Sequence, residues 1–261
     1  MAKILIGQAG TNGSSVENFS EIKKIGLDAV EIEFTYGVWM TKEQALNIRE
    51  ANKKLGLKLS IHAPYFINLN SEEKAKIGAS KSRILKSCEI GNLLSNGEKI
   101  PIVFHAGFYL KDSKEKTFEN IKEQILEMQQ VIIKKKLNVL LSPETTGKPS
   151  QFGDLDEILR LREETDCSFC IDFSHLKARY NGKINYGDII KKLKNEKKIH
   201  SHFSGIEYTE KGERKHVITS EKEIKELFSH IKNLNAEITI INESPETMKD
   251  ALKMKEILKE I

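Results

Sequence analysis

Side chains that can bind metal ions stand at the ends of six successive short, apolar, β-branched runs of the sequence. Imidazole and carboxylate groups hold Zn²⁺ or Mn²⁺ in proteins, and one carboxylate can bridge two ions about 3.5–4 Å apart. A single residue of this kind more often forms ordinary hydrogen bonds or caps a helix, but six in succession predict a metal centre. The residues are His62 in SIHAPY, His105 in IVFHAG, Glu144 in LSPET, Asp172 with His175 in CIDFSH, His202 in HSHFSG and Glu243 in INESPE.

His200 and two cysteines have the residue types of ligands but favour other interpretations. Side chains two residues apart on a strand face the same side, so His200 is expected deeper than His202, in a supporting role. Cys167 and Cys170 have zinc-ribbon spacing, but the sequence has no second C-x-x-C pair. We therefore expect the two cysteines to be a buried structural pair.

The six run ends can meet only in a fold that collects them at one place. Apolar runs alternate with longer segments of helical period, and no linker divides residues 1–261, which predicts one domain. Eight repeats of about 33 residues match a single (β/α)8 TIM barrel, whose strands end at a common mouth. A doubly wound open sheet is the alternative, but Gly7, Gly10 and Gly13 lack the G-x-G-x-x-G spacing of a dinucleotide turn. The predicted strands are 4–8, 29–34, 57–61, 100–105, 138–142, 168–172, 199–204 and 237–242.

Helix starts are indicated where an oxygen-bearing side chain stands three residues before a Glu or Gln, as in a capping box. A last helix is predicted over 245–258. The four capping pairs are Thr41 with Gln44, Asn70 with Glu73, Asp112 with Glu115, and Ser220 with Glu223.

Composition excludes several classes of protein. The chain has 39% hydrophobic and 31% charged residues, which is typical of a globular domain rather than a fibre or a disordered tail. The longest apolar run, 238–241, is far too short for a membrane span, and the start lacks the layout of a signal peptide. Three cysteines favour a reducing compartment. We expect a cytoplasmic, monomeric protein whose charge of +4 permits a polyanionic partner without requiring one.

The order His, His, Glu, Asp-x-x-His, His, x-His, Glu resembles the endonuclease IV family of abasic-site nucleases. The resemblance covers nearly the whole chain and is carried by HAPYFINL, FHAG, CIDFSH, HFSG and ESPE. It implies a xylose-isomerase-like TIM barrel and a phosphodiester hydrolase of the deoxyribonuclease IV type. Such an enzyme cleaves DNA 5′ to abasic sites in base-excision repair.

The resemblance also implies a ligand set for two Zn²⁺ ions, with Mn²⁺ as another candidate metal. Glu144 would bridge the ions and orient the nucleophile, which makes it the catalytic residue. The first ion would be held by His62, His105 and Glu144, and the second by Glu144, Asp172, His202 and Glu243.

A third ion of the family uses the histidine of D-x-x-H and a later D-x-H pair. His175 and His216 match its histidines, but Arg214 stands where the family has Asp, and Glu213 is displaced by one residue. The retained histidines favour three ions, with Glu213 as the third-site carboxylate through a shifted loop. The alternative is two ions, with Arg214 binding a DNA phosphate instead.

Double-stranded DNA with an abasic site is the partner that the resemblance implies, with the damaged nucleotide flipped out of the duplex. Tyr65 in HAPY matches a family tyrosine, and Trp39 in FTYGVWM is the large side chain after the second strand, where no Arg is present. Trp39 fits a DNA wedge and a packing role equally. Lysines at 134–136 are expected at the opposite mouth. The basic residues expected at the mouth with the metal ligands are Lys111, Lys148, Lys177, Arg179, Lys183, Lys211, Arg214 and Lys215.

Two other functions compete with cleavage of DNA. A sugar isomerase or epimerase shares the barrel and uses Glu, Asp, His and Glu around one divalent ion, but has no use for His62 and His105. A barrel that binds damaged DNA without cutting it would explain Arg214 and the missing Arg after the second strand.

Overall fold

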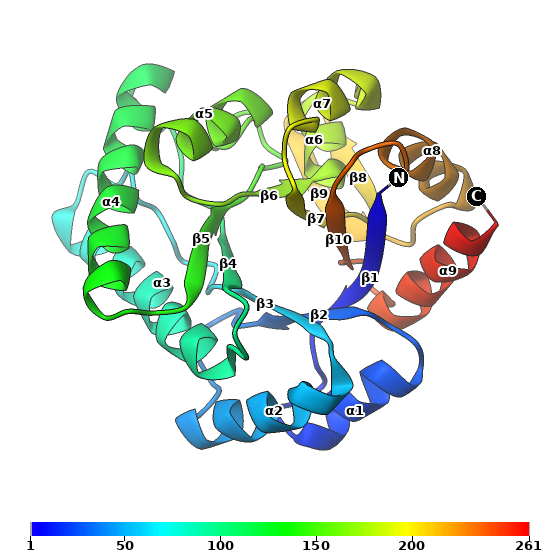
Figure 1. The fold of residues 1–261 in the computed structure, drawn as a ribbon. Helices are drawn as coiled ribbons and strands as arrows, with labels where there is room; N and C mark the ends of the chain where they lie inside the picture. The colour runs from blue at the N-terminus through cyan, green and yellow to red at the C-terminus, as the bar shows by residue number, and fades with distance from the viewer. Residues whose placement is uncertain (1, 261) are drawn as a thin grey trace.

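Eight parallel strands form the centre of the computed structural model, which describes residues 2–260. Their spatial order is β5-β4-β3-β2-β1-β10-β7-β6, so the first and last strands of the barrel lie side by side (Figure 1). The strands are β1 (Lys3–Ala9), β2 (Ala29–Glu33), β3 (Lys58–His62), β4 (Ile100–Phe104), β5 (Val139–Pro143), β6 (Cys170–Asp172), β7 (Lys198–His202) and β10 (Glu237–Asn242).

The barrel closes between β5 and β6, the two ends of the hydrogen-bonded order. Thr145 N donates to Cys170 O at 3.1 Å, and Ser168 N donates to Leu141 O at 2.8 Å. A parallel bridge between Glu144 and Cys170 lies between these bonds. The predicted single (β/α)8 TIM barrel is therefore confirmed.

Helices surround the strands in an outer ring (Figure 1). Two predicted capping boxes are confirmed: Thr41 with Gln44 starts α2, and Ser220 with Glu223 starts α8. The helices are α1 (Val16–Lys24), α2 (Lys42–Leu55), α3 (Lys74–Leu94), α4 (Lys114–Lys134), α5 (Leu155–Thr165), α6 (Phe173–Arg179), α7 (Tyr186–Leu193), α8 (Glu221–Ile231) and α9 (Thr247–Lys259). Among the residues described, no helix is long and apolar enough to cross a membrane.

The other two capping predictions are wrong. Asn70 does not cap α3; its side-chain amide donates to Phe108 O at 2.9 Å and ties two loops together. The cap of α4 is Ser113, whose hydroxyl accepts from Lys116 N at 3.2 Å, one residue later than predicted. At both positions the two residues stand three apart, but no helix begins directly after the first of them, so the spacing alone does not make a cap.

The alternation of side chains along the strands separates an apolar layer from a polar interior. On β2, Val30 and Ile32 are fully buried, and they pack with the hydrophobic core. Glu31, between them, contacts His200 and His202 of β7 across the inside of the barrel. Barrel interiors are usually filled by Val, Ile and Leu, so acidic and imidazole groups mark this interior as chemically specialised.

A β-hairpin follows β7 where the sequence predicts only a loop. Strands β8 (Gly205–Thr209) and β9 (Gly212–Val217) pair antiparallel. Glu207 faces Lys215 and Tyr208 faces Glu213, so Arg214 is the extra residue of a β-bulge. The expected loop shift is therefore a bulge in a paired strand, a pairing that residue spacing does not reveal.

Candidate metal centre

One cavity of about 550 Å³ at the carboxyl ends of the strands is lined by His62, His105, His175, His216 and Glu243. The other predicted ligands, the buried Glu144, Asp172 and His202, share ligand groups with these residues. Each strand delivers its side chain there because parallel strands in a barrel all end at the same mouth. Three overlapping groups have ligand atoms within 4.8 Å of one another: His62, His105 and Glu144; Glu144, Asp172, His202 and Glu243; and Asp172, His175 and His216.

Glu144 lies at the centre of these groups and is almost completely buried. Its Oε2 lies 3.2 Å from His62 Nε2 and 3.0 Å from His105 Nε2. Its Oε1 lies 3.2 Å from His175 Nδ1 and 3.1 Å from His202 Nδ1. The two oxygens of one carboxylate thus face two separate sets of imidazoles.

The second group adds two carboxylates to His202. Glu243 Oε1 lies 3.3 Å from His202 Nδ1. Asp172 Oδ1 accepts a hydrogen bond from His175 N at 2.7 Å and so caps α6, while its fully buried Oδ2 lies 3.2 Å from His175 Nδ1 but accepts no hydrogen bond from the residues described. A buried carboxylate oxygen without a donor is costly unless a cation lies against it. This donor set therefore fits a divalent ion.

The third group depends on the bulge in the hairpin. Because Arg214 is the extra residue, Glu213 and His216 face the same side of β9, and Arg214 is exposed. Glu213 Oε2 lies 3.5 Å from His175 Nε2. The structure therefore brings Glu213, and not Arg214, toward His175.

Hydrogen bonds to main-chain and hydroxyl oxygens orient the imidazoles. His62 Nδ1 lies 2.9 Å from Ala63 O, which leaves Nε2 toward Glu144. His216 Nδ1 lies 2.6 Å from Ser204 Oγ, which leaves Nε2 toward the cavity. A histidine whose other nitrogen bonds to an acceptor presents a lone pair of known direction to an ion.

The buried charges of the cluster hold one another in ionised form. Burial opposes the charge of Glu144, but the facing histidines hold the pKa of its carboxyl well below its usual range. Burial also opposes the charge of His62, but Glu144 and neighbouring carboxylates raise the pKa of the imidazole to about 10. Burial raises the pKa of Glu243 to about 7. Cations that bind here must replace protons on the imidazoles.

Glu31 and Glu33 of β2 are site residues that the sequence analysis missed. Glu33 lines the cavity with the predicted ligands, and ligand atoms of Glu31, Glu33 and Glu243 lie within 4.8 Å of one another. Burial raises the pKa of Glu33 to about 7. The signal is present in VEIEF, where two acidic residues alternate with apolar ones on a predicted strand.

The two predicted DNA-contacting aromatics lie beside the cavity. Tyr65 lines it, and its ring stands edge-on to His62 with centroids 6.0 Å apart. The half-exposed Trp39 packs edge-on against Phe34 and donates to Glu33 O at 2.8 Å. Sequence reasoning missed two more aromatic side chains of the same loops, Tyr36 (82% exposed) and Phe66 (62% exposed), whose rings lie 6.4 Å apart.

Two of the basic residues expected at this mouth are engaged in hydrogen bonds or ion pairs with other residues of the chain. Arg179 is buried, and its Nη1 donates to Lys148 O at 2.7 Å and to Gln151 O at 3.0 Å, so its assignment as an open phosphate contact is wrong. Lys177 pairs with Glu223 at 2.5 Å. Lys148 does line the cavity.

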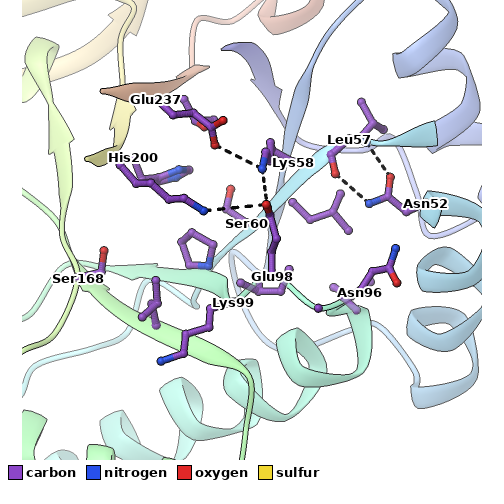
Figure 2. Close-up of a pocket in the computed structure, with 18 of the residues that line it drawn as sticks. Asn52, Leu57, Lys58, Ser60, Asn96, Glu98, Lys99, Ser168, His200 and Glu237 are labelled. Atoms are coloured by element: carbon purple, nitrogen blue, oxygen red, sulfur yellow. Dashed lines mark hydrogen bonds and ion pairs between the residues drawn. The ribbon is translucent and has the colours of Figure 1, made fainter. Parts of the chain in front are cut away.

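A larger cavity, of about 700 Å³, lies at the opposite mouth of the barrel (Figure 2). Lys58 Nζ there lies 2.5 Å from Glu98 Oε2 and 3.4 Å from Glu237 Oε1. His200 is part of its lining and separates it from the interior of the barrel. The larger cavity thus contains paired Lys and Glu side chains, and the smaller one is lined by five of the predicted ligands.

The fold and the site define a TIM barrel whose carboxyl mouth carries histidines and carboxylates in groups that could hold metal ions. The chain belongs to the xylose isomerase-like TIM barrel family, whose sequence model matches residues 19–261. Proteins that resemble this chain in sequence or in fold are described as a probable endonuclease and as an epimerase-like protein, so membership alone leaves the reaction open.

Three similar proteins illustrate this range. An uncharacterized protein of Methanocaldococcus jannaschii is 37% identical over 99% of this chain and 98% of its own length. A probable endonuclease 4 of Aster yellows witches'-broom phytoplasma is 32% identical over 59% of this chain and 55% of its own. The crystal structure of a D-tagatose 3-epimerase-like protein superposes with a TM-score of 0.74 at 20% identity, covering 99% of this chain and 96% of the other.

Proposed function

We propose that the protein is a metal-dependent phosphodiesterase that cleaves double-stranded DNA 5′ to abasic sites. The observation that carries the proposal is the position of Glu144, whose two oxygens face separate imidazole sets. A carboxylate in this position suits two ions rather than one. The similarity to the probable endonuclease 4 supports the same choice of reaction.

The protein's own residues would hold two Zn²⁺ or Mn²⁺ ions around Glu144. When bound, such ions lower the pKa of an attacking water and neutralise charge on the phosphate. Glu144 then holds the reacting groups in line, and its histidine neighbours fix its orientation. The two ligand sets would be His62, His105 and Glu144, and Glu144, Asp172, His202 and Glu243.

A third ion would lie between His175 and the hairpin. Glu213 supplies the carboxylate through the bulge at Arg214, and His216 supplies a second imidazole. With Glu213 in this position, the exposed guanidinium of Arg214 is free to meet a DNA phosphate.

Aromatic side chains at the rim suit a duplex whose damaged nucleotide is rotated out. Tyr65 lies beside His62, and Tyr36 and Phe66 project beyond it with most of their surface exposed. Flat apolar groups replace base stacking where a nucleotide has left the helix. Lys148, on the lining of the cavity, supplies positive charge for the backbone.

The test is cleavage of a duplex oligonucleotide that carries one stable abasic analogue. We expect a single cut on the 5′ side of the analogue, dependent on Zn²⁺ or Mn²⁺ and abolished by a chelator. An undamaged duplex of the same sequence is the control. Binding of the damaged duplex without any cut would instead support the non-cleaving alternative.

A sugar epimerase is the second candidate, because Glu144, Asp172, His202 and Glu243 alone form a four-ligand site for one ion. The ion count separates the two functions. One ion per chain, retained in a His62→Ala variant, together with epimerisation of a ketose, would support the epimerase.

A further inference from the structure

Glu31 is a fully buried carboxylate whose close contacts are two histidines of one strand. Its Oε1 lies 2.8 Å from His202 Nε2, and its Oε2 lies 2.9 Å from His200 Nε2. In the part of the chain that the structure describes, neither Lys nor Arg pairs with it. An ionised carboxylate in such a place must be held by these two imidazoles.

We propose that Glu31 is a positioning residue of the metal centre, one that fixes the tautomer and the direction of His202. The inference rests on the proposed function, because it assumes that His202 is a metal ligand. When an ion takes the place of the proton on Nδ1, the carboxylate against Nε2 keeps the remaining hydrogen on Nε2, so that Nδ1 presents its lone pair to the ion. Nδ1 is the atom that lies 3.1 Å from Glu144 and 3.3 Å from Glu243.

His200 also helps to hold Glu31 in place. It occupies the second oxygen of Glu31 and stands between that carboxylate and the large cavity of the opposite mouth, where Figure 2 shows it. Glu31 is therefore anchored by a hydrogen bond at Oε2, while its Oε1 lies 2.8 Å from His202 Nε2 as an ion-pair contact and not a hydrogen bond. This gives His200 the supporting role that its position two residues before His202 predicts.

Ser60 provides a matched control within the same layer of the barrel. It lies directly opposite Glu31 in the β2–β3 register, and it is equally buried. Its hydroxyl has no hydrogen-bond partner among the described residues. Ser60→Ala therefore disturbs the same layer of the barrel without touching His202.

The experiment measures Zn²⁺ binding by equilibrium dialysis of Glu31→Gln, Ser60→Ala and the unaltered protein. Glutamine keeps the shape but offers only one accepting oxygen to two imidazoles. We expect Glu31→Gln to lose about 10–100-fold in affinity for one ion, with the remaining ions bound as before. Ser60→Ala is expected to bind as the unaltered protein does. Substitution with Co²⁺ should show an altered absorption spectrum in Glu31→Gln alone.

A direct spectroscopic measurement keeps the inference testable if Glu31→Gln does not fold. Long-range proton–nitrogen spectra of the unaltered, Zn²⁺-loaded protein report which nitrogen of His202 carries hydrogen. Hydrogen on Nε2 supports the inference, and hydrogen on Nδ1 overturns it. Unchanged Zn²⁺ affinity in a folded Glu31→Gln also overturns it and leaves the proposed function standing. Absence of Zn²⁺ and Mn²⁺ binding by the unaltered protein overturns both.

Discussion

The two mouths of the barrel balance their charges in opposite ways. At the amino mouth, each acidic side chain meets lysine: Glu98 and Glu237 hold Lys58, and Lys3 pairs with Glu237 at 2.7 Å. At the carboxyl mouth, Glu144 and Asp172 meet only histidines among the described residues. Histidine gives up its proton to a metal ion far more readily than lysine does. The carboxyl mouth, which holds the smaller of the two cavities, is therefore the one at which metal ions can replace protons.

The largest expected effect comes from breaking the carboxyl mouth at its centre. Glu144→Gln should lower cleavage of abasic DNA by at least about 100-fold, because both proposed ions lose a shared ligand. The measurement is initial rate on the abasic duplex. Glu98→Gln at the amino mouth is the matched control and should cleave normally. Full activity of the unaltered protein in excess chelator would refute the metal mechanism.

The hairpin allows a sharper test of ion number. Glu213→Ala should remove one Zn²⁺ and leave the ions around Glu144, because Glu213 faces His175 alone among the predicted ligands. Arg214→Ala should keep every ion. Zinc content per chain, measured after dialysis against buffered Zn²⁺, separates the two variants. Loss of an ion from Arg214→Ala, with none lost from Glu213→Ala, would contradict the assignment.

Metal-free protein should become less stable as pH rises. The pKa of His62 is about 10 in the folded chain against 6.5 for the free side chain, and those of His175 and His202 are also raised well above their usual value. A histidine whose pKa is raised in the folded state contributes its full stabilisation below about pH 6.5. This stabilisation is lost as the pH rises through the pKa of the folded state. The melting temperature in chelator should therefore fall between about pH 7 and pH 10.

Two comparisons sharpen that measurement. Excess Zn²⁺ should flatten the decline, because ions replace the protons that the carboxylates attract. His62→Gln should also reduce the decline, since it removes one of the titrating groups. A melting temperature that rises with pH in chelator would show that the cluster does not hold these protons.

Removing the exposed rim aromatics should have a moderate effect. Phe66→Ala and Tyr36→Ala are expected to weaken binding of abasic duplex about 5–50-fold each, the range for loss of one stacking contact. Ile133→Ala, an exposed apolar side chain on α4, is the control and should bind normally. If all three variants bind the abasic duplex equally well, the exposed aromatic side chains at the rim do not contact DNA.

The smallest expected effect belongs to the lysines at 134–136. They lie at the C-terminal end of α4, of which Lys134 is the last residue, and Lys135 pairs with Glu89 at 2.7 Å. Their replacement by alanine should leave the salt dependence of DNA binding unchanged, because that dependence counts only contacted phosphates. A shallower slope would place DNA at the amino mouth.

Local patterns in the sequence were sufficient to predict the barrel and the candidate ligands at the ends of its strands. Eight apolar runs alternating with helical segments predict the fold, and the strand-end residues from His62 to Glu243 do come together in overlapping groups at one mouth. Glu31 and Glu33 lie in one of the predicted strands as well. Their alternation in VEIEF indicates acidic side chains on one face of a strand, but only the neighbours across the barrel show that this face belongs to the candidate site.

The sequence by itself determined which residues alternate and, to within two residues, where each strand ends, because these depend on spacing along one strand. Only the tertiary structure decided that Glu213 replaces Arg214 beside His175, since the bulge depends on pairing between β8 and β9. Likewise, Glu31 meets His202 only because β2 and β7 lie across a closed barrel. Contacts between distant strands depend on the register and closure of the whole sheet, which no local spacing contains.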